Sequence, residues 1–163
     1  MTDPSAASVT RSDHSIVVRV QAPVVAETVF ARLTDPQWHV RLDGSGTVKG
    51  AVDPQEITAA GQKFVMEMYF EDRGRYRTEN TVLEVIPGRR VAWTVARVGN
   101  PPAGVRWQWD VEPAGEVDGA AGSLITHTYD WAEVIDPVIL GRIPRVSAEE
   151  MEQTITRLVD ASR

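Results

Sequence analysis

Apolar and polar residues alternate along several stretches of this chain, which is the pattern of strands that bury one face. The clearest case is residues 105–113, VRWQWDVEP, whose apolar and polar side chains point to opposite faces. Residues 62–71, QKFVMEMYFE, and residues 14–22, HSIVVRVQA, alternate in the same way. The same period, with Gly, Pro and Asn at the breaks, predicts further strands over residues 46–53, 75–86, 90–98 and 123–134.

Helical spacing replaces this alternation near both ends of the chain. After Pro23, apolar residues recur every three or four positions up to Asp35-Pro36, and PQWHVRLD then predicts a second short helix or turn. Near the C-terminus, Ser147 and Glu150 match a capping box. The residues that follow form an apolar stripe typical of an amphipathic helix: Met151, Ile155, Leu158 and Val159.

The order of these elements predicts an α+β domain. Strands joined by hairpin turns form an antiparallel sheet, and the terminal helix is the largest element that can cover its apolar face. We expect a curved sheet of about seven strands around a long C-terminal helix, with two short helices after the first strand. Residues 14–163 are expected to form this single domain, and residues 1–13 a disordered leader of small and polar residues.

Composition excludes several classes of site and partner. The chain has 163 residues and no cysteine, which rules out disulfides, thiolate metal sites and a cysteine nucleophile. Its net charge of −6 argues against a nucleic-acid partner. No secretory signal and no apolar run near the ~20 residues of a membrane span are present, so a cytoplasmic location is expected. A homodimer remains possible from the sequence.

Four segments resemble the SRPBCC superfamily of START-like, helix-grip domains. They are HSIVVRVQAPVVAETVFARLTDP near the start, ENTVLEVIPGRRVAWTV in the middle, THTYDW, and IPRVSAEEMEQTITRLV at the terminal helix. Together they are similar to the bacterial polyketide cyclase/dehydrase-like branch. The resemblance extends from about His14 to Ala161 and implies a deep cavity between the sheet and the terminal helix.

The resemblance implies a fold more specifically than a function. Its members include lipid carriers, cyclases, hormone receptors and co-chaperone activators, and they share no short catalytic signature. We therefore expect a small hydrophobic or aromatic ligand in the cavity. The alternatives are a polyketide cyclase or aromatase type of enzyme and a co-chaperone-like protein-interaction module.

Aromatic and methionine side chains are the candidates for the cavity wall. Five tryptophans are present, four of them on predicted strands, and indoles and thioethers suit an apolar ligand with few polar contacts. The alternative is that these side chains only fill the core. The complete candidate set for ligand binding is Trp38, Phe64, Met66, Met68, Tyr76, Asn80, Trp93, Trp107, Trp109, His127, Tyr129 and Trp131.

The stretch LITHTYDW, residues 124–131, contains the candidates for catalysis. Strand alternation places His127, Tyr129 and Trp131 on one face, and the cost of burying Asp130 predicts that this face points inward. An imidazole and a phenol side by side could act as base and proton donor, so His127 and Tyr129 are the catalytic candidates. The alternative is that both are polar groups of the inner face without a catalytic role.

Residues 75–86 leave the inward face of their strand open. If Leu83 and Val85 point inward, strict alternation carries Arg77 and Glu79 inward as well. A β-bulge would return these charges to solvent and leave Tyr76 and Asn80 facing the cavity, which is the interpretation that we prefer.

Other motifs are missing or incomplete. His14, His39 and His127 lack metal-ligand spacing, so neither a metal nor another cofactor is expected. Asp43-Gly-Ser-Gly46 precedes no helix that could make it a phosphate loop. The apolar connector over residues 135–146 is a candidate lid for the cavity.

Overall fold

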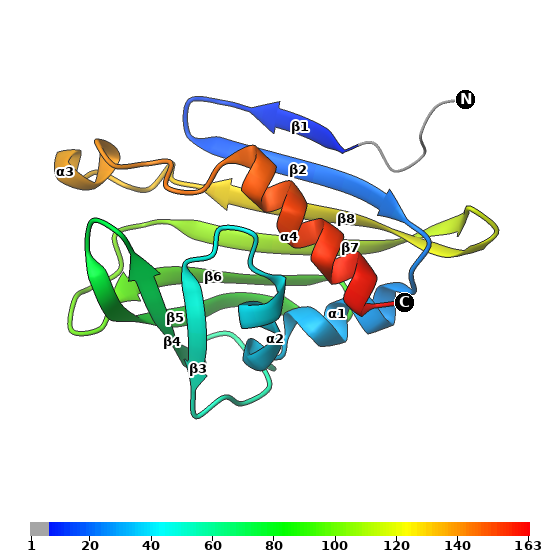
Figure 1. Ribbon diagram of the computed structural model, residues 1–163, viewed down its shortest axis with the longest axis horizontal. Coiled ribbons are helices and arrows are strands. Elements are labelled where there is room, and N and C mark those ends of the chain that lie inside the picture. Colours follow the sequence, from blue (N-terminus) through cyan, green and yellow to red (C-terminus); the bar gives the residue numbers. More distant parts are fainter. Residues whose placement is uncertain (1–6) are drawn as a thin grey trace.

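The computed structural model describes residues 7–163, and its central feature is one antiparallel sheet of eight strands. The strands lie in the spatial order β1-β2-β8-β7-β6-β5-β4-β3, so the early strand β2 pairs with the last strand β8, and β1 and β3 are the two edges (Figure 1). In this order they are β1 (Ser8–Arg11), β2 (Ser15–Ala22), β8 (Ala120–Asp130), β7 (Arg106–Val117), β6 (Arg90–Arg97), β5 (Gly74–Ile86), β4 (Lys63–Phe70) and β3 (Val48–Val52).

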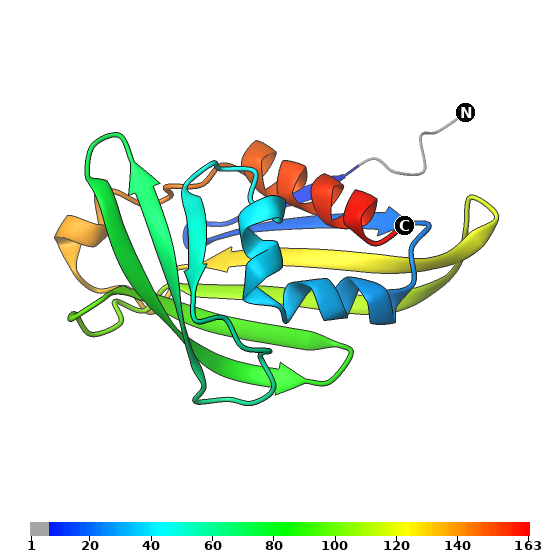
Figure 2. The same cartoon turned by 60° about the horizontal axis from the view of Figure 1, so that its bottom comes forward.

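Three helices lie on the concave face of this sheet, as the two views in Figures 1 and 2 show. They are α1 (Ala26–Leu33), α2 (Pro36–Leu42) and the C-terminal helix α4 (Ala148–Ala161). The short helix α3 (Pro137–Leu140) lies apart from them, at one end of the molecule in both views. The predicted α+β architecture, a curved sheet around a C-terminal helix, is therefore confirmed.

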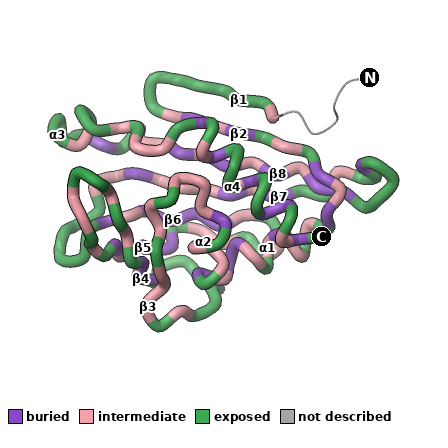
Figure 3. Tube along the Cα trace, viewed as in Figure 1, coloured by how far each residue is buried: buried purple, intermediate pink, exposed green. Residues whose placement is uncertain are grey.

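The start of the chain differs from the expectation. Residues 1–6 of the predicted leader lie outside the described residues, but Ser8–Arg11 forms β1 and pairs with β2, Val9 opposite Val18. This edge strand raises the number of strands from about seven to eight. The residue pattern does not indicate β1, because all four of its residues are exposed and no buried face imposes an alternation (Figure 3).

The Gly- and Ala-rich stretch over residues 114–122 forms most of the tip of the β7–β8 hairpin. The two strands pair as far as Val117 opposite Ala120, with a register shift between Pro113 and Glu116. Backbone pairing at this tip does not need large side chains, so strands form here despite the Gly- and Ala-rich composition.

A bulge in β5 resolves the conflict over the inward face of that strand. The β5–β6 register shifts between Val82 and Glu84, and Leu83 at the shift is exposed. Before the bulge, Thr78, Asn80 and Val82 are buried, while Arg77 points to solvent. The bulge interpretation was therefore correct, and β5 turns Tyr76 and Asn80 toward the concave face.

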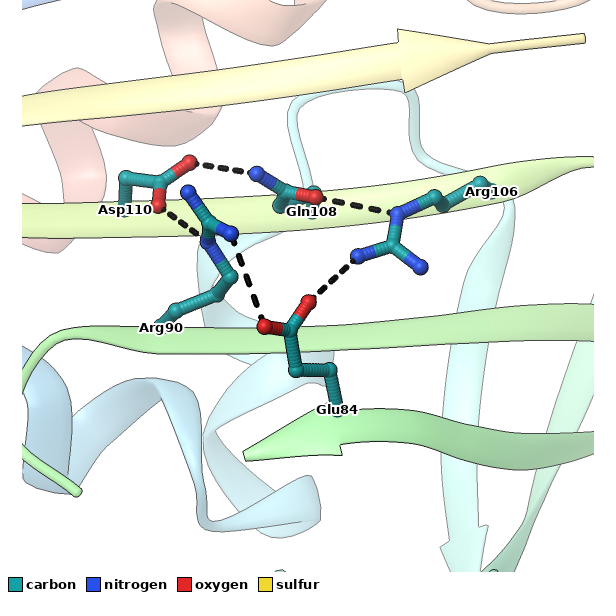
Figure 4. A network of polar contacts seen from close by, with 5 residues as sticks. All are labelled: Glu84, Arg90, Arg106, Gln108 and Asp110. Atoms are coloured by element: carbon teal, nitrogen blue, oxygen red, sulfur yellow. Dashed lines mark hydrogen bonds and ion pairs between the residues drawn. The ribbon is translucent and has the colours of Figure 1, made fainter. Parts of the chain in front are cut away.

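The outer face of the sheet carries a connected set of charges (Figure 4). Arg90 binds Asp110 at 2.6 Å and Glu84 at 3.5 Å, and Arg106 binds the other oxygen of Glu84 at 2.9 Å. The Gln108 side chain joins the two ends, because it accepts from Arg106 and donates to Asp110. Each charge in this network has a partner, so we assign it to stabilising the convex face of the sheet and not to a site.

Helix α4 begins with the predicted capping box. The Ser147 hydroxyl accepts from the Glu150 backbone N–H at 3.1 Å, and the Glu150 carboxylate accepts from the Ser147 N–H at 3.0 Å. Gly44 lies against the next turn, where its N–H donates to the Thr154 hydroxyl at 2.8 Å and a Cβ would overlap the Glu150 carbonyl oxygen. The glycine-rich stretch after α2 thus serves close packing on α4.

Loss of this cap should weaken the fold measurably. We expect Ser147→Ala to lower the free energy of unfolding by about 1 kcal/mol, because it leaves a helix N–H without its acceptor. Urea denaturation followed by circular dichroism measures the change. Thr156→Ala, on the exposed face of the same helix, is the matched control and should change the value by less than about 0.5 kcal/mol. An equal loss in both variants would show that the cap contributes nothing specific.

Candidate functional site

A cavity of about 980 Å³ lies on the concave side of the sheet. Strands β4 to β8 form its floor, and α2, residues 43–48 and the connector after β8 form its other walls. Helix α4 contributes only Thr154 to the lining. The expectation was a cavity between the sheet and the terminal helix, but the cavity lies mainly beneath α2 and the connector. Its volume is in the range of sites that enclose small organic molecules.

Aromatic rings pack tightly at the inner end of the cavity. Trp93 of β6 stacks on the His39 ring of α2, with ring centres 5.2 Å apart, and Phe64 of β4 meets Trp93 edge-on at 5.4 Å. Both Phe64 and Trp93 are buried. This end is therefore a rigid apolar wall that contains one imidazole.

Two aromatic pairs follow from the register of β7 and β8. Trp109 lies opposite His127, and Trp107 lies opposite Tyr129. Inward side chains at paired positions are close neighbours in a sheet, and here the rings stack, with centres 3.6 Å apart for Trp109 and His127 and 4.1 Å for Trp107 and Tyr129. Trp109 is only 4% exposed whereas Trp107 is half-buried, so Trp107 offers more ring surface to a ligand.

A few polar groups from β5 lie among these rings. The Asn80 amide donates to the Phe64 carbonyl at 3.2 Å, and the Thr78 hydroxyl lies 3.5 Å from the same amide nitrogen. Both residues are buried and line the cavity. They can give a ligand polar contacts in an otherwise apolar wall.

Both imidazoles of the cavity are held neutral. Burial, and secondarily the neighbouring His39, lower the pKa of His127 from 6.5 to about 3. Burial also lowers the pKa of His39, although its Nε2–H donates to the Leu33 carbonyl at 2.7 Å and opposes this shift. The His127 Nδ1 atom is enclosed and has no hydrogen-bond partner within residues 7–163. His127 is thus a neutral polar group and a weak base.

The two phenols of the cavity stay protonated. Burial raises the pKa of Tyr129 and of Tyr76 above the usual value of 10.0. The Tyr129 oxygen accepts from the Arg145 backbone N–H at 3.4 Å, which ties β8 to the connector. Its own O–H can donate to a carbonyl or other acceptor of a ligand.

Ten of the twelve predicted ligand-binding residues line the cavity: Phe64, Met66, Met68, Tyr76, Asn80, Trp93, Trp107, Trp109, His127 and Tyr129. Trp38 and Trp131 are not among the lining residues. Trp38 instead packs against the guanidinium groups of Arg32 and Arg41, at 4.4 and 5.1 Å. Trp131 lies just beyond the end of β8, so strand alternation no longer sets its direction, and it meets Tyr129 edge-on at 5.1 Å.

Sequence reasoning missed His39 and four arginines that line the cavity. His39 and Leu42, three residues apart on α2, both reach it, whereas Trp38 lies on another side of the helix. That helical spacing could have indicated His39. The arginines Arg73, Arg97, Arg142 and Arg145 come from a turn, a strand end and the connector, where no period predicts a direction.

The connector over residues 135–146 borders the cavity, as expected for a lid. Its side chains Ile139, Ile143 and Val146 line the cavity and pack against the core. Ile135 also lines it but is 88% exposed, so the cavity opens to solvent beside this residue.

Two findings bear on metals and membranes. Within residues 7–163, no group of three or more His, Cys, Asp or Glu side chains could hold a metal ion. None of the helices that the structure describes is long and apolar enough to cross a membrane.

The sequence matches a family model described as polyketide cyclase / dehydrase and lipid transport over residues 13–162. An uncharacterized protein of Mycobacterium tuberculosis is 32% identical over 114 residues, which cover 70% of this chain and 45% of that protein. The chain thus aligns with about half the length of this curated relative.

Solved structures share the fold at low sequence identity. A protein from Arthrobacter aurescens has a TM-score of 0.69 at 16% identity, with 94% of this chain and 90% of that chain covered. The Aha1 dimer from Colwellia psychrerythraea has a TM-score of 0.53 at 16% identity, with 91% and 95% covered. Such likeness establishes the shared architecture.

Proposed function

Because the chain belongs to the polyketide cyclase/dehydrase and lipid-transport family, within the START-like helix-grip superfamily, we propose that it binds a small hydrophobic or aromatic molecule in its cavity. The observation that carries the proposal is the cavity of about 980 Å³ with its wall of stacked aromatic rings and methionines. If these side chains only filled the core, they would leave no cavity of this size, because packed protein interiors leave few voids larger than a water molecule.

The character of the wall also favours an apolar or aromatic ligand. Trp107 and Met68 are incompletely buried by the protein itself and line the cavity, so their surface is available to a guest. Asn80 and Tyr129 supply isolated polar contacts, which would fix the orientation of the ligand more than its affinity.

Catalysis of the cyclase type is the weaker proposal for this site. His127 and Tyr129 line the same cavity and could supply the base and the proton donor that an aldol-type reaction needs. However, an imidazole with a pKa near 3 is a poor proton acceptor at neutral pH, whereas a general base works best with a pKa near the working pH. The arrangement therefore favours binding, with Tyr129 as a donor to a ligand carbonyl.

The expected location, the expected lack of a nucleic-acid partner and the two assembly roles have weaker support. A cytoplasmic location and the lack of a nucleic-acid partner are proposed from composition alone. A homodimer and a co-chaperone-like role have only the fold shared with the Aha1 dimer in their support.

Titration with the neutral fluorescent probe phenylnaphthylamine (NPN) tests the binding proposal. We expect saturable binding of one probe per chain, and a loss of affinity of about tenfold in Trp107→Ala, because a large aromatic contact surface is removed. Tyr69→Ala, on the outer face of β4, is the matched control and should bind like the unchanged protein. Absence of saturable binding, verified by native mass spectrometry, would overturn the proposal.

A further inference from the structure

Four arginines gather at the open end of the cavity. Arg73 lies in the turn between β4 and β5, Arg97 ends β6, and Arg142 and Arg145 belong to the connector. Both views place these segments at the same end of the molecule, next to α3 (Figures 1 and 2). We call this group the arginine mouth.

Aromatic rings of the cavity hold two of these guanidinium groups. The Arg145 group lies 4.1 Å from the centre of the Phe70 ring, and the Arg97 group lies 5.4 Å from that of Tyr76. Phe70 and Tyr76 stack on each other, with centres 6.1 Å apart, and both line the cavity. Cation–π contacts of this kind hold a guanidinium in place while its N–H donors stay available.

Most of the donors in the arginine mouth have no acceptor among the residues that the structure describes. Arg145 binds Asp72 through Nη2 at 2.9 Å, but its Nε is enclosed and has no partner within residues 7–163. Arg73, Arg97 and Arg142 form no ion pair with any described residue. An enclosed donor without an acceptor costs free energy, which an acceptor from a ligand would recover.

The two acidic residues of the lining, Asp43 and Asp136, form no ion pair with these arginines among the described residues. Asp43 accepts from the backbone N–H groups of Ser45, Thr47 and Val48, near α2. Asp136 caps α3 by accepting from Val138. Asp72 pairs with one of the four arginines, Arg145, so the arginine mouth is still a local excess of positive charge on a protein whose net charge is −6.

We infer that the ligand is an anionic amphiphile, with a carboxylate or phosphate at the arginine mouth and an apolar or aromatic body against Trp107 and Met68. Guanidinium forks match the paired oxygens of both head groups. The rest of the cavity, whose imidazoles are uncharged, takes the apolar body, so the cavity fixes the direction of the ligand. This inference rests on the proposed binding function and adds the charge and orientation of the ligand to it.

Two probes that differ by one charged group test the anionic head group separately from the binding of an apolar ligand. Anilinonaphthalene sulfonate (ANS) has the same ring skeleton as NPN and adds one sulfonate. In Arg145→Met and, separately, Arg97→Met, we expect ANS affinity to fall about tenfold, because a charge-assisted contact is lost, while NPN affinity stays within about twofold. High salt should weaken ANS binding and leave NPN binding unchanged.

Arg77→Met is the control, because Arg77 lies on the outer face of β5 and pairs with Glu67. It should change the affinity for neither probe. If the mouth variants lose ANS and NPN affinity equally, or keep full ANS affinity, the inference of an anionic ligand falls while the cavity remains a binding site. If the unchanged protein binds neither probe, the binding function itself fails.

Competition by natural head groups distinguishes their sources. We expect dodecanoate or dodecyl phosphate to displace NPN from the unchanged protein at lower concentration than dodecanol does. The better of the two competitors identifies the head group as carboxylate or phosphate. Equal displacement by dodecanol and by both acids would overturn the inference, because the arginine mouth would then give no preference for charge.

Discussion

Trp109→Ala is expected to lower the free energy of unfolding by about 3–5 kcal/mol, the cost of deleting a large aromatic side chain from a core. Trp109 is 4% exposed, stacks on His127 and lies opposite Val91 of β6. Its removal would leave a void between β6, β7 and β8, where the backbone is held by pairing on both sides and cannot collapse. Denaturation in urea, followed by fluorescence and circular dichroism, measures the loss.

Trp107→Ala is the matched variant on the same face of β7. Because Trp107 is half-buried and borders the open cavity, we expect it to cost less than about 2 kcal/mol of stability. Trp109→Phe retains a ring and provides a folded comparison if the alanine variant does not fold. A larger loss of stability in Trp107→Ala than in Trp109→Ala would contradict the assignment of Trp109 to the core and Trp107 to the ligand wall.

Trp107 and Trp109 also show which features of the site the sequence could predict and which it could not. Period-two alternation placed Trp107, Trp109, His127 and Tyr129 on inward faces, since side-chain direction in a strand is set locally. How deeply each is buried depends on what packs above it, so the sequence could not separate wall from core. Trp131 shows the same limit at an element boundary, because β8 ends at Asp130, one residue before it.

The polar end of the site could not be predicted from local patterns. Arg73, Arg97, Arg142 and Arg145 come together only through the path of the chain between β4 and β5, after β6 and after β8. His39 and His127 are far apart in sequence, and both reach the cavity only because α2 folds over the sheet, where His39 stacks on Trp93 of β6. Long-range contacts of this kind leave no periodic signal.

The stability of the protein is expected to fall by about 2 kcal/mol between about pH 8 and about pH 5 through His127 alone. In the unfolded chain this imidazole takes up a proton below its ordinary pKa of 6.5, whereas in the folded protein its pKa is about 3. The unfolded state therefore binds more protons between these values, and stability falls as the pH falls. His39 adds to the loss with the same sign, because burial lowers its pKa as well.

Asp and Glu ordinarily titrate at about pH 4, below this window. The hydrogen bond from Arg145 lowers the pKa of Asp72 below its ordinary 3.8, so the stability that this pair contributes is lost only at more acidic pH. The loss between about pH 8 and about pH 5 can thus be assigned to buried imidazoles by substitution.

His127→Phe keeps a ring against Trp109 and removes the titrating group, so we expect it to lose about 2 kcal/mol less than the unchanged protein over the same pH range. Tyr69→Phe, at an exposed position of β4, removes no imidazole and should keep the full loss. Urea denaturation at several pH values gives the free energies, and only the slopes with pH are compared, because the substitutions also shift the baseline. An unchanged slope in His127→Phe would mean that His127 titrates normally in the folded protein. It would then be available as a base near neutral pH, and the balance between ligand binding and cyclase chemistry at this site would move toward catalysis.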